Sequence, residues 1–226
     1  MFPVTFNIIT DGKADWRVRE IVDSIHNMHV QPSACQINIV GGKTSTLFGV
    51  SGDVFHIPFD EDQRQGWITR KKNIATAHSF YDVCVYLHDY HVFDPNWYLN
   101  LLQFGLDWDI QMHQIIMQNG YRMLDWLIYD HPVYPIYTPI PYDRHDLVPY
   151  QYISGGYWVA KRLVMQSEPQ NEALLHHQAE DLDWSVRVRD KYTIKMNPSC
   201  IVRHNKPHRE NEYQKMRMLT VNERLA

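Results

Sequence analysis

Short apolar runs recur along the first part of the chain and are separated by amphipathic segments. Runs of five or six residues, rich in Val and Ile, lie at 4–9, 35–40, 54–58 and 83–87. Apolar runs of this length that stop at Gly, Pro or Asp are typical of buried strands. Between them, residues 15–28 place Val, Ile and Met at helical spacing, and residues 68–82 combine Ile and Ala with a basic start. The pattern predicts the order β-α-β-β-α-β.

Strands and helices in this order predict an α/β fold with a mostly parallel central sheet and helices on both of its faces. The carboxyl ends of parallel strands meet at one edge of such a sheet, and ligands bind there. The side chains that follow the strand at 83–87 are therefore the first candidates for a binding site.

The second half of the chain has a weaker pattern. Segments 96–104 and 179–192 are predicted helices, and the predicted strands are 110–117, 157–160, 193–196 and 200–202. Residues 129–152 hold five prolines and six tyrosines, a composition that resists regular structure. Long irregular segments in compact domains are usually either functional lids or disordered, and we expect this one to close over a site. No repeat or linker divides the chain, which predicts a single domain over 1–226.

Composition excludes several classes of protein. The chain has 226 residues, 44% of them hydrophobic, and a formal net charge of -4. This balance argues against non-specific binding of nucleic acid, whose affinity comes from Lys and Arg on phosphates. Three separate cysteines, Cys35, Cys84 and Cys200, predict buried thiols and a cytoplasmic location. We expect no transmembrane segment, because no apolar stretch reaches the ~20 residues of a membrane span, and no N-terminal signal segment is recognisable.

The strand at 83–87 runs directly into ionisable side chains, in the sequence LHDYHVFDPNW at 87–97. Alternate residues of an extended chain point the same way, so Asp89 and His91 can face one cation. One carboxylate and one imidazole suit a divalent ion such as Mn²⁺, with phosphate oxygens completing its coordination. The alternative is that these residues make ordinary hydrogen bonds in a loop. Their position at a strand end favours a functional site.

Three other short motifs carry candidate chemistry. The basic run RKK at 70–72 begins a helix, where it either meets a pyrophosphate or forms a solvated face. The acidic pair ED at 180–181 also begins a helix, and an ionised carboxylate there either stabilises the helix dipole or takes a proton from an attacking hydroxyl. The glycine pair at 155–156 allows a close approach of the backbone, and a neighbouring aromatic ring such as Trp158 can stack on a sugar.

The order of these motifs resembles that of GT-A glycosyltransferases, and most of all the large inverting group called family 2. In that family an Arg and an Asn precede a strand that ends in an acidic DxD motif, and a Gly pair and a Glu-Asp dipeptide follow. The counterparts here are RKKN at 70–73, LHDYHVFDPNWY at 87–98, GG at 155–156, and ED at 180–181 with Arg187. The resemblance spans most of residues 4–204.

The resemblance implies inverting transfer of a hexose-type sugar from a nucleotide-sugar, with a UDP-sugar as the expected donor, to a hydroxyl of a glycan acceptor. Asp181 would be the catalytic base. Residues 1–95 would form the nucleotide-binding half, and residues 96–226 the acceptor-binding half. The donor site would comprise Thr10, Arg70, His88 and Asp89. The acceptor and sugar site would comprise Gly155, Gly156, Trp158 and Glu180.

The resemblance also implies a divalent cofactor, Mn²⁺ or Mg²⁺, held on the diphosphate by Asp89, His91 and His204. The metal motif differs from the family pattern, because alignment on the flanking Leu and Pro puts the usual acid at Tyr90. His91 and Tyr90 therefore both remain candidates for that position, and His208 remains an alternative to His204.

Two other classes of protein share some of these features. A nucleotidyltransferase acting on a sugar phosphate would share the sheet and the metal, but it usually carries a Gly-rich, Lys-containing loop, of which DGKADWR at 11–17 is a weak hint. A non-catalytic carbohydrate-binding module would keep the aromatic rings without needing Asp89 or Asp181. The partners expected of a glycosyltransferase are a nucleotide-sugar and a glycan or glycoconjugate, with no nucleic acid.

Overall fold

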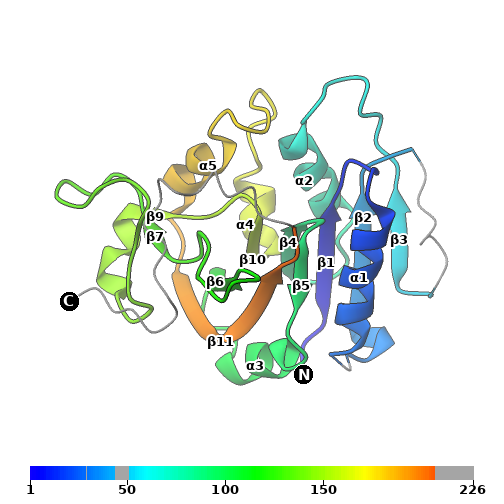
Figure 1. The fold of residues 1–226 in the computed structure, drawn as a ribbon, viewed down its shortest axis with the longest axis horizontal. Coiled ribbons are helices and arrows are strands. Elements are labelled where there is room, and N and C mark those ends of the chain that lie inside the picture. Colours follow the sequence, from blue (N-terminus) through cyan, green and yellow to red (C-terminus); the bar gives the residue numbers. More distant parts are fainter. Residues whose placement is uncertain (29, 44–50, 207–226) are drawn as a thin grey trace.

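A mixed eight-stranded sheet forms the centre of the protein (Figure 1). The structure is a computed structural model, and it describes residues 1–28, 30–43 and 51–206. The strand order in these residues is β3-β2-β1-β4-β10-β6-β11-β5. The first four run parallel to one another. They are β1 (Val4–Ile9), β2 (Cys35–Val40), β3 (Val54–Ile57) and β4 (Val83–His88), which confirms the strands predicted from the apolar runs.

The other half of the sheet is mixed. β10 (Tyr157–Lys161) runs antiparallel to both β4 and β6 (Ile110–Ile116). β11 (Ile194–His204) runs parallel to β6, and the short β5 (His91–Phe93) is antiparallel to β11. The sequence predicts two short strands where β11 is one strand, because its register shifts after Asn197 and interrupts the apolar pattern. The sheet as a whole is mostly parallel, as predicted.

Helices cover both faces of the sheet, as the sequence predicts (Figure 1). α1 and α3 pack on one face, and α2, α4 and α5 pack on the other. Their bounds are α1 (Asp15–His26), α2 (Ile68–Ala77), α3 (Trp97–Phe104), α4 (Arg162–Ser167) and α5 (Glu180–Val188), with 3-10 helices η1 (Pro32–Ala34) and η2 (His145–Tyr150). None of the described helices is long and apolar enough to cross a membrane.

The alternation of side chains along β4 decides which way the residues at its end face. Val85 and Leu87 join the core on the α1 side, whereas Cys84 and Tyr86 join the core on the α5 side. His88 continues the second series, because every other side chain of a strand points the same way. The end of β4 therefore presents an imidazole to the layer that holds α2 and α5.

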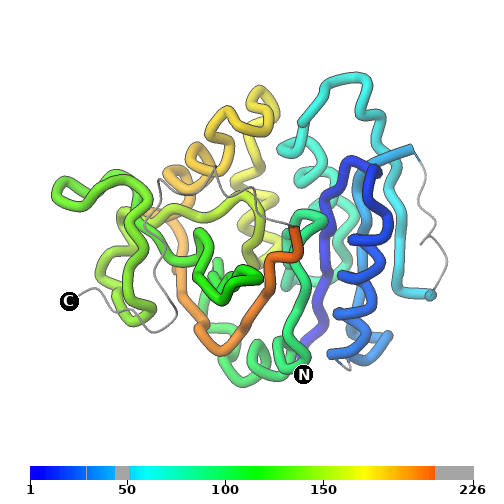
Figure 2. The backbone as a smooth tube through the Cα atoms, viewed as in Figure 1, coloured from blue at the N-terminus to red at the C-terminus, as the bar shows by residue number. Residues whose placement is uncertain are grey.

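The Pro- and Tyr-rich segment is more regular than predicted. It contributes to a second, antiparallel sheet of the described chain, in the order β8-β7-β9, formed by Leu127–Ile128 (β7), Thr138–Pro139 (β8) and Gln151–Tyr152 (β9). Residues between β7 and β8 project from the body of the molecule (Figure 2), and Val133 there is 80% exposed. The prediction of a wholly irregular loop is wrong, because two-residue strands leave no periodic signal.

A buried ion pair supports this small sheet. The guanidinium of Arg122 and the carboxylate of Asp125 lie 2.8 Å apart, and both side chains are buried. The Tyr142 hydroxyl donates a 2.7 Å hydrogen bond to the same carboxylate.

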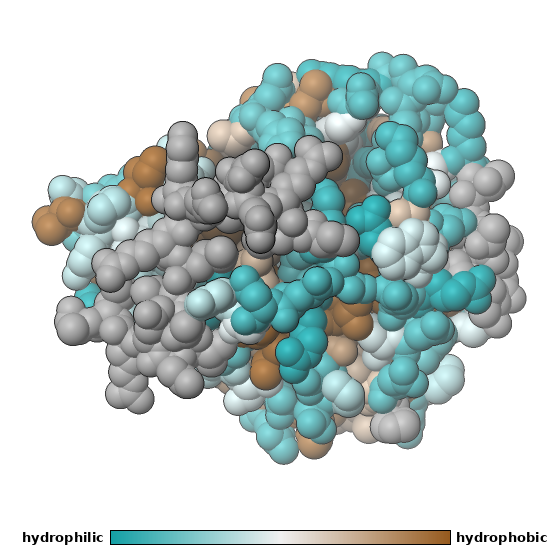
Figure 3. Space-filling view, in the orientation of Figure 1, coloured by the Kyte–Doolittle hydropathy of each residue, from teal (hydrophilic) through white to brown (hydrophobic). Residues whose placement is uncertain are grey.

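The surface of the described residues visible in Figure 3 is mainly hydrophilic, with hydrophobic residues in scattered patches.

Candidate active site

The carboxyl ends of β1 and β4 define the site. The chain passes outward from β1 through β2 and β3 and then returns to β4, on the other side of β1. Such a reversal leaves a crevice at the carboxyl ends of the two strands, where α/β proteins bind ligands. Thr10 follows β1 and Asp89 follows β4, and the Thr10 hydroxyl donates a 2.8 Å hydrogen bond to the Asp89 carboxylate. Two predicted donor-site residues are thus brought together.

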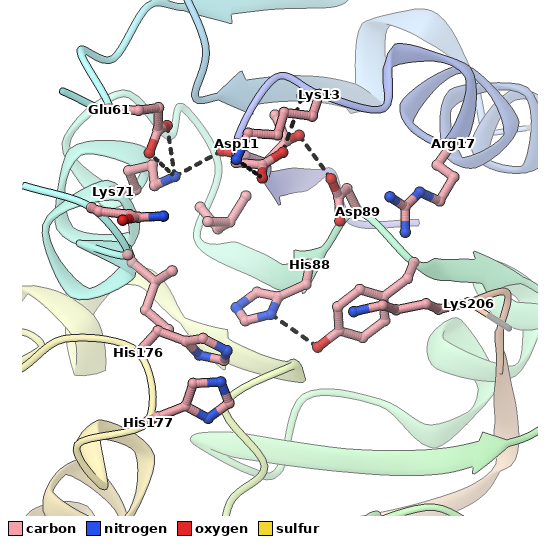
Figure 4. Close-up of a pocket in the computed structure, with 16 residues that line it drawn as sticks. Asp11, Lys13, Arg17, Glu61, Lys71, His88, Asp89, His176, His177 and Lys206 are labelled. Atoms are coloured by element: carbon pink, nitrogen blue, oxygen red, sulfur yellow. Dashed lines mark hydrogen bonds and ion pairs between the residues drawn. The ribbon is translucent and has the colours of Figure 1, made fainter. Parts of the chain in front are cut away.

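A pocket of about 490 Å³ lies at this crevice, and we call it the donor pocket (Figure 4). Its volume is within the range of small-molecule binding sites. Its walls come from the ends of β1 and β4, the start of α1, the segment before α2 with the first turn of that helix, and the loop before α5. The ionisable residues of its lining are Asp11, Lys13, Arg17, Glu61, Lys71, His88, Asp89, Tyr90, His176, His177 and Lys206.

Lys71 connects two sides of the donor pocket. Its side chain is buried, and its ammonium donates 2.8 Å hydrogen bonds to the backbone oxygen of Thr10 and to the carboxylate of Glu61. Because a buried charge without partners is costly, these bonds fix the first turn of α2 against the end of β1. Lys71 therefore supplies the basic side chain that the sequence analysis expected from Arg70.

Arg70 itself points away from the donor pocket. Its guanidinium pairs with both oxygens of the Glu172 carboxylate, at 3.0 and 2.9 Å, on the surface. It is not part of the pocket lining, whereas Lys71 is. Successive residues of a helix differ by about 100° in direction, so these two neighbours face different sides. The predicted contact of Arg70 with a diphosphate is not supported by this placement.

Burial sets the charge of the residues at the end of β4. It raises the pKa of Asp89 above its ordinary value, and the hydrogen bond from Thr10 opposes this effect. It lowers the pKa of His88 well below its ordinary value, and the charge of Lys72 adds to this effect. The Nδ1 of His88 lies 3.0 Å from the Tyr90 hydroxyl, whereas its Nε2 is buried without a hydrogen-bond partner in the described part of the chain. His88 is therefore a neutral imidazole at physiological pH.

A smaller pocket of about 150 Å³ adjoins the donor pocket. His88, Tyr90 and His176 line both pockets, so the two are adjacent. The smaller pocket extends to Asp181 at the start of α5 and to the Gly155–Gly156 turn before β10. We call it the base pocket, after the predicted role of Asp181.

Three hydrogen bonds hold the Asp181 carboxylate. The Tyr152 hydroxyl and the Gly155 N–H, at 3.2 Å, donate to its Oδ2, and the Leu182 N–H donates to its Oδ1 at 2.9 Å. A Cβ at Gly155 would lie 2.9 Å from the Asp181 Cβ, closer than such atoms approach in proteins. The position of the carboxylate therefore requires a glycine at 155.

Gly156 is also in close contact with other parts of the site. A Cβ there would lie 3.1 Å from the Tyr90 hydroxyl oxygen and 3.2 Å from the His91 Cε1. Its carbonyl accepts a 3.0 Å hydrogen bond from the His88 N–H. The glycine pair thus packs the turn before β10 directly against the end of β4, which brings the two predicted motifs together.

Glu180 and Lys72 are buried beside the base pocket. Burial, with the charge of Asp181, raises the pKa of Glu180, and Lys72 opposes this shift. Burial lowers the pKa of Lys72 to about 8, against the attraction of Glu180 and Asp181. The Lys72 ammonium lies 4.7 Å from the ring centroid of Trp158 and has no hydrogen-bond partner in the described residues. When protonated it is stabilised by a ring face and by nearby carboxylates.

Trp158 belongs to the core and lines neither pocket. Its side chain is 1% exposed, stacks on Tyr86 with ring centroids 5.1 Å apart, and packs against Trp184. The alternation along β10 turns it toward the α5 layer. A ring with this burial does not stack on a sugar, so the prediction for Trp158 is wrong.

The three predicted metal ligands do not gather around one point. Asp89 accepts a hydrogen bond from Thr10, whereas His91 and His204 are cross-strand neighbours on β5 and β11, with ring centroids 5.6 Å apart. In the described ranges, no group of three or more His, Cys, Asp or Glu side chains is placed to hold a metal ion. These residues therefore do not fit a three-ligand Mn²⁺ or Mg²⁺ site. His208, the alternative ligand, lies outside the described residues.

Two contributions to the site were missed by the sequence analysis. His176 and His177 line the donor pocket, and the available signal was the dipeptide itself, four residues before the Glu-Asp motif. Tyr152 contacts Asp181, and no sequence signal indicates this, because the contact depends on the pairing of β9 with β7.

Comparison with known proteins identifies the fold. No protein-family model matches the sequence. No curated protein matches it either. Among solved structures, S. aureus TarS 1–349 in complex with UDP-GlcNAc gives a TM-score of 0.67 at 10% sequence identity, covering 92% of this chain and 60% of that one. A longer S. aureus TarS chain gives 0.67 at 11% identity, covering 91% of this chain and 37% of that one.

These structures establish that the chain has the GT-A fold, the class that the order of its motifs predicts. At 10–11% identity the likeness extends to the fold alone. The chain spans 37% to 60% of the length of these TarS chains.

Proposed function

We propose that this protein is a glycosyltransferase that transfers a sugar from a UDP-sugar to a hydroxyl of a glycan acceptor, with inversion at the anomeric carbon. The observation that carries this proposal is the adjacency of the two pockets. The pocket that contains the Asp181 carboxylate shares three lining residues with the donor pocket at the β1–β4 crevice. The TarS complex with UDP-GlcNAc, which has the same fold, supports the choice of donor.

The donor pocket supplies binding groups for the nucleotide. Thr10 and Asp89 lie at the crevice between β1 and β4, where a hydroxyl and a carboxylate suit the hydroxyl groups of a ribose. Arg17 and Lys206 add positive charge to the lining, which favours a diphosphate. Most residues that line the donor pocket lie before residue 95, in the half of the chain that we propose to bind the nucleotide.

Asp181 is the proposed base. The acceptor oxygen attacks the anomeric carbon as the bond to the diphosphate breaks on the opposite face, and the acceptor proton passes to the Asp181 carboxylate. Tyr152, Gly155 and Leu182 hold this proton acceptor in one orientation, which is a requirement of positioned catalysis. We assign no step to a metal, because the described residues do not form a three-ligand site.

Replacement of Asp181 tests the proposal. Asp181→Asn is expected to lower the rate of transfer about 10²- to 10⁴-fold, because the proton acceptor is lost, while the affinity for UDP stays within about twofold. Activity is measured as UDP release from a panel of nucleotide-sugars with glycan acceptors, and affinity by calorimetry. Asp183→Asn, in the same helical turn, is the matched control, since Asp183 pairs with Arg187 at 3.1 Å and lies outside both pocket linings. Normal turnover by Asp181→Asn would remove the base assignment.

The same panel separates the two other classes. Release of pyrophosphate from a nucleoside triphosphate would indicate a nucleotidyltransferase, and glycan binding without donor turnover would indicate a carbohydrate-binding module. The segment at 11–17 gives the first of these little support, because its Lys13 pairs with Asp11 at 3.3 Å and is 76% exposed.

A further inference from the structure

The loop 169–179, which we call the histidine loop, joins α4 to α5 and forms one wall of the donor pocket. It lies beside the start of α2 (Figure 2). The Trp67 indole donates a 2.8 Å hydrogen bond to the Glu172 carbonyl, and the His176 N–H donates one of 2.9 Å to the Gly66 carbonyl. Hydrogen bonds therefore hold the histidine loop against the start of α2, the helix that carries Lys71.

The histidine loop presents two adjacent imidazoles to the donor pocket. The ring centroids of His176 and His177 lie 3.7 Å apart, and the pair faces the same space as Lys206 and Asp89 (Figure 4). His177 and Ala179 have φ angles of 68° and 59°, in the left-handed region. Such a conformation costs a residue other than glycine roughly 1–3 kcal/mol and persists where the surroundings impose it, often at functional sites.

His176 stands where the two pockets meet. It is one of three residues that line both, and the other two, His88 and Tyr90, are hydrogen-bonded to each other. The junction lies between the nucleotide site and Asp181, which is where the bond from the sugar to the diphosphate must break. The His176 imidazole thus lies at the position that the proposed reaction assigns to the leaving group.

Two of the four other cations in the described lining of the donor pocket are paired with carboxylates. Lys71 pairs with Glu61 at 2.8 Å, and Lys13 pairs with Asp11 at 3.3 Å. The imidazoles of the histidine loop are not part of these pairs. Even a neutral imidazole keeps one ring N–H, which is able to donate a hydrogen bond to an anion.

We propose that His176 and His177 bind the diphosphate of the donor and stabilise the negative charge that collects on it as the sugar leaves. This inference rests on the function proposed above. The bond from the acceptor oxygen to the anomeric carbon forms, and the bond from that carbon to the diphosphate oxygen breaks with its electron pair. The acceptor proton goes to Asp181, and the imidazoles contribute hydrogen bonds without net transfer of a proton.

The test compares ligands that differ only in their phosphates. Binding of uridine, UMP and UDP is measured by calorimetry in EDTA for the wild type and for the double variant His176→Ala/His177→Ala. The double variant is expected to lose at least about tenfold in affinity for UDP, the effect of one or two charge-assisted hydrogen bonds. Its affinity for uridine is expected to stay within about twofold. His78→Ala, at the exposed end of α2, is the matched control and is expected to bind all three ligands normally.

A variant that keeps N–H donors at positions 176 and 177 separates hydrogen bonding from a purely structural role of the loop. His176→Gln/His177→Gln keeps N–H donors and is expected to recover part of the UDP affinity. Equal losses for uridine and UDP would show that the loop only supports the fold, and would overturn the inference. UDP affinity unchanged in the double variant, or dependent on Mn²⁺ alone, would overturn it and leave the glycosyltransferase proposal standing. Failure of the wild type to bind UDP would overturn both.

Discussion

At the residue scale, Lys72 has the most unusual surroundings in the described site. It is 1% exposed, faces the Trp158 ring, and has a pKa lowered to about 8 by burial. Below pH 8 both the folded and the unfolded chain hold this proton, so the fold carries the full cost of the buried charge. Between pH 8 and the ordinary value of 10.5 the folded chain alone loses it, so stability rises with pH.

Lys72→Met is therefore expected to raise the free energy of unfolding at pH 7 by about 1–3 kcal/mol, because the variant does not bury a charge. The gain should shrink toward zero at pH 10. Urea unfolding at the two pH values measures it. Lys191→Met removes a surface partner of Glu168 and serves as the control, with no comparable dependence on pH. A gain of the same size at both pH values would contradict the lowered pKa.

The sequence predicted the placement of residues at the ends of helices and strands better than the placement of residues inside them. Thr10, Asp89 and Asp181 interrupt apolar runs or begin a helix, and a break of this kind is visible in the sequence. Arg70 and Trp158 lie within elements, so their direction depends on the phase of a helix and on which core a strand face enters. Both sides of the sheet are covered here, and the apolar pattern therefore does not tell one face from the other.

At the scale of elements, the small β8-β7-β9 sheet supports the base pocket. Tyr152 of β9 donates a hydrogen bond to Asp181, so the orientation of the carboxylate depends on this sheet. The Arg122–Asp125 ion pair, with both side chains no more than 6% exposed, holds the segment that leads into β7. Loss of one member of a buried pair leaves the other charge without a partner.

Asp125→Ala is expected to lower the free energy of unfolding by about 3–5 kcal/mol, the usual effect of breaking a buried pair from one side. Denaturant unfolding measures the change. Asp146→Ala breaks the surface pair with Arg144 and is the control, with an expected change below about 1 kcal/mol. If the two variants were equally stable, the ion pair would not support this part of the fold.

Sequence patterns did not predict the small sheet, and they did not predict that β11 is one continuous strand. The two-residue strands at 127–128 and 138–139 are too short for an alternation of side chains to appear. They form because β7 pairs with β8, a segment distant in the sequence, and the buried polar network around Asp125 stabilises them. The longer strands and the helices that flank the β1–β4 crevice were predictable, because each carries a run or a periodic face of its own.

At the scale of the whole molecule, the fold class follows from the order of elements, and the position of the site follows from the fold class. In a sheet built from alternating strands and helices, the order of the strands reverses at one position. Here it reverses between β1 and β4, and the donor pocket lies at the ends of these two strands. The ligand is not determined in this way, because one fold supports many sites. The histidine loop shows this, since residues distant in sequence complete the pocket.

Ligand binding is expected to stabilise the whole domain. UDP at about 100 times its dissociation constant adds about 2.7 kcal/mol to the free energy of unfolding, which raises the melting temperature by about 5–10 °C for a chain of this size. Thermal melts with UDP, GDP and ADP measure the shift and its selectivity. Thr10→Val removes the hydroxyl at the crevice and should reduce the shift. Equal shifts with all three nucleotides would contradict a preference for uridine.

The contact between Gly155 and Asp181 limits how the proposed acceptor site can be engineered. The carboxylate occupies the volume that any larger residue at 155 would need, so widening the entrance there would displace the proposed base. The projecting segment between β7 and β8 has no such restriction, since Val133 is 80% and Ile136 62% exposed. Substitutions in that segment are therefore expected to leave the Gly155–Asp181 contact as it is.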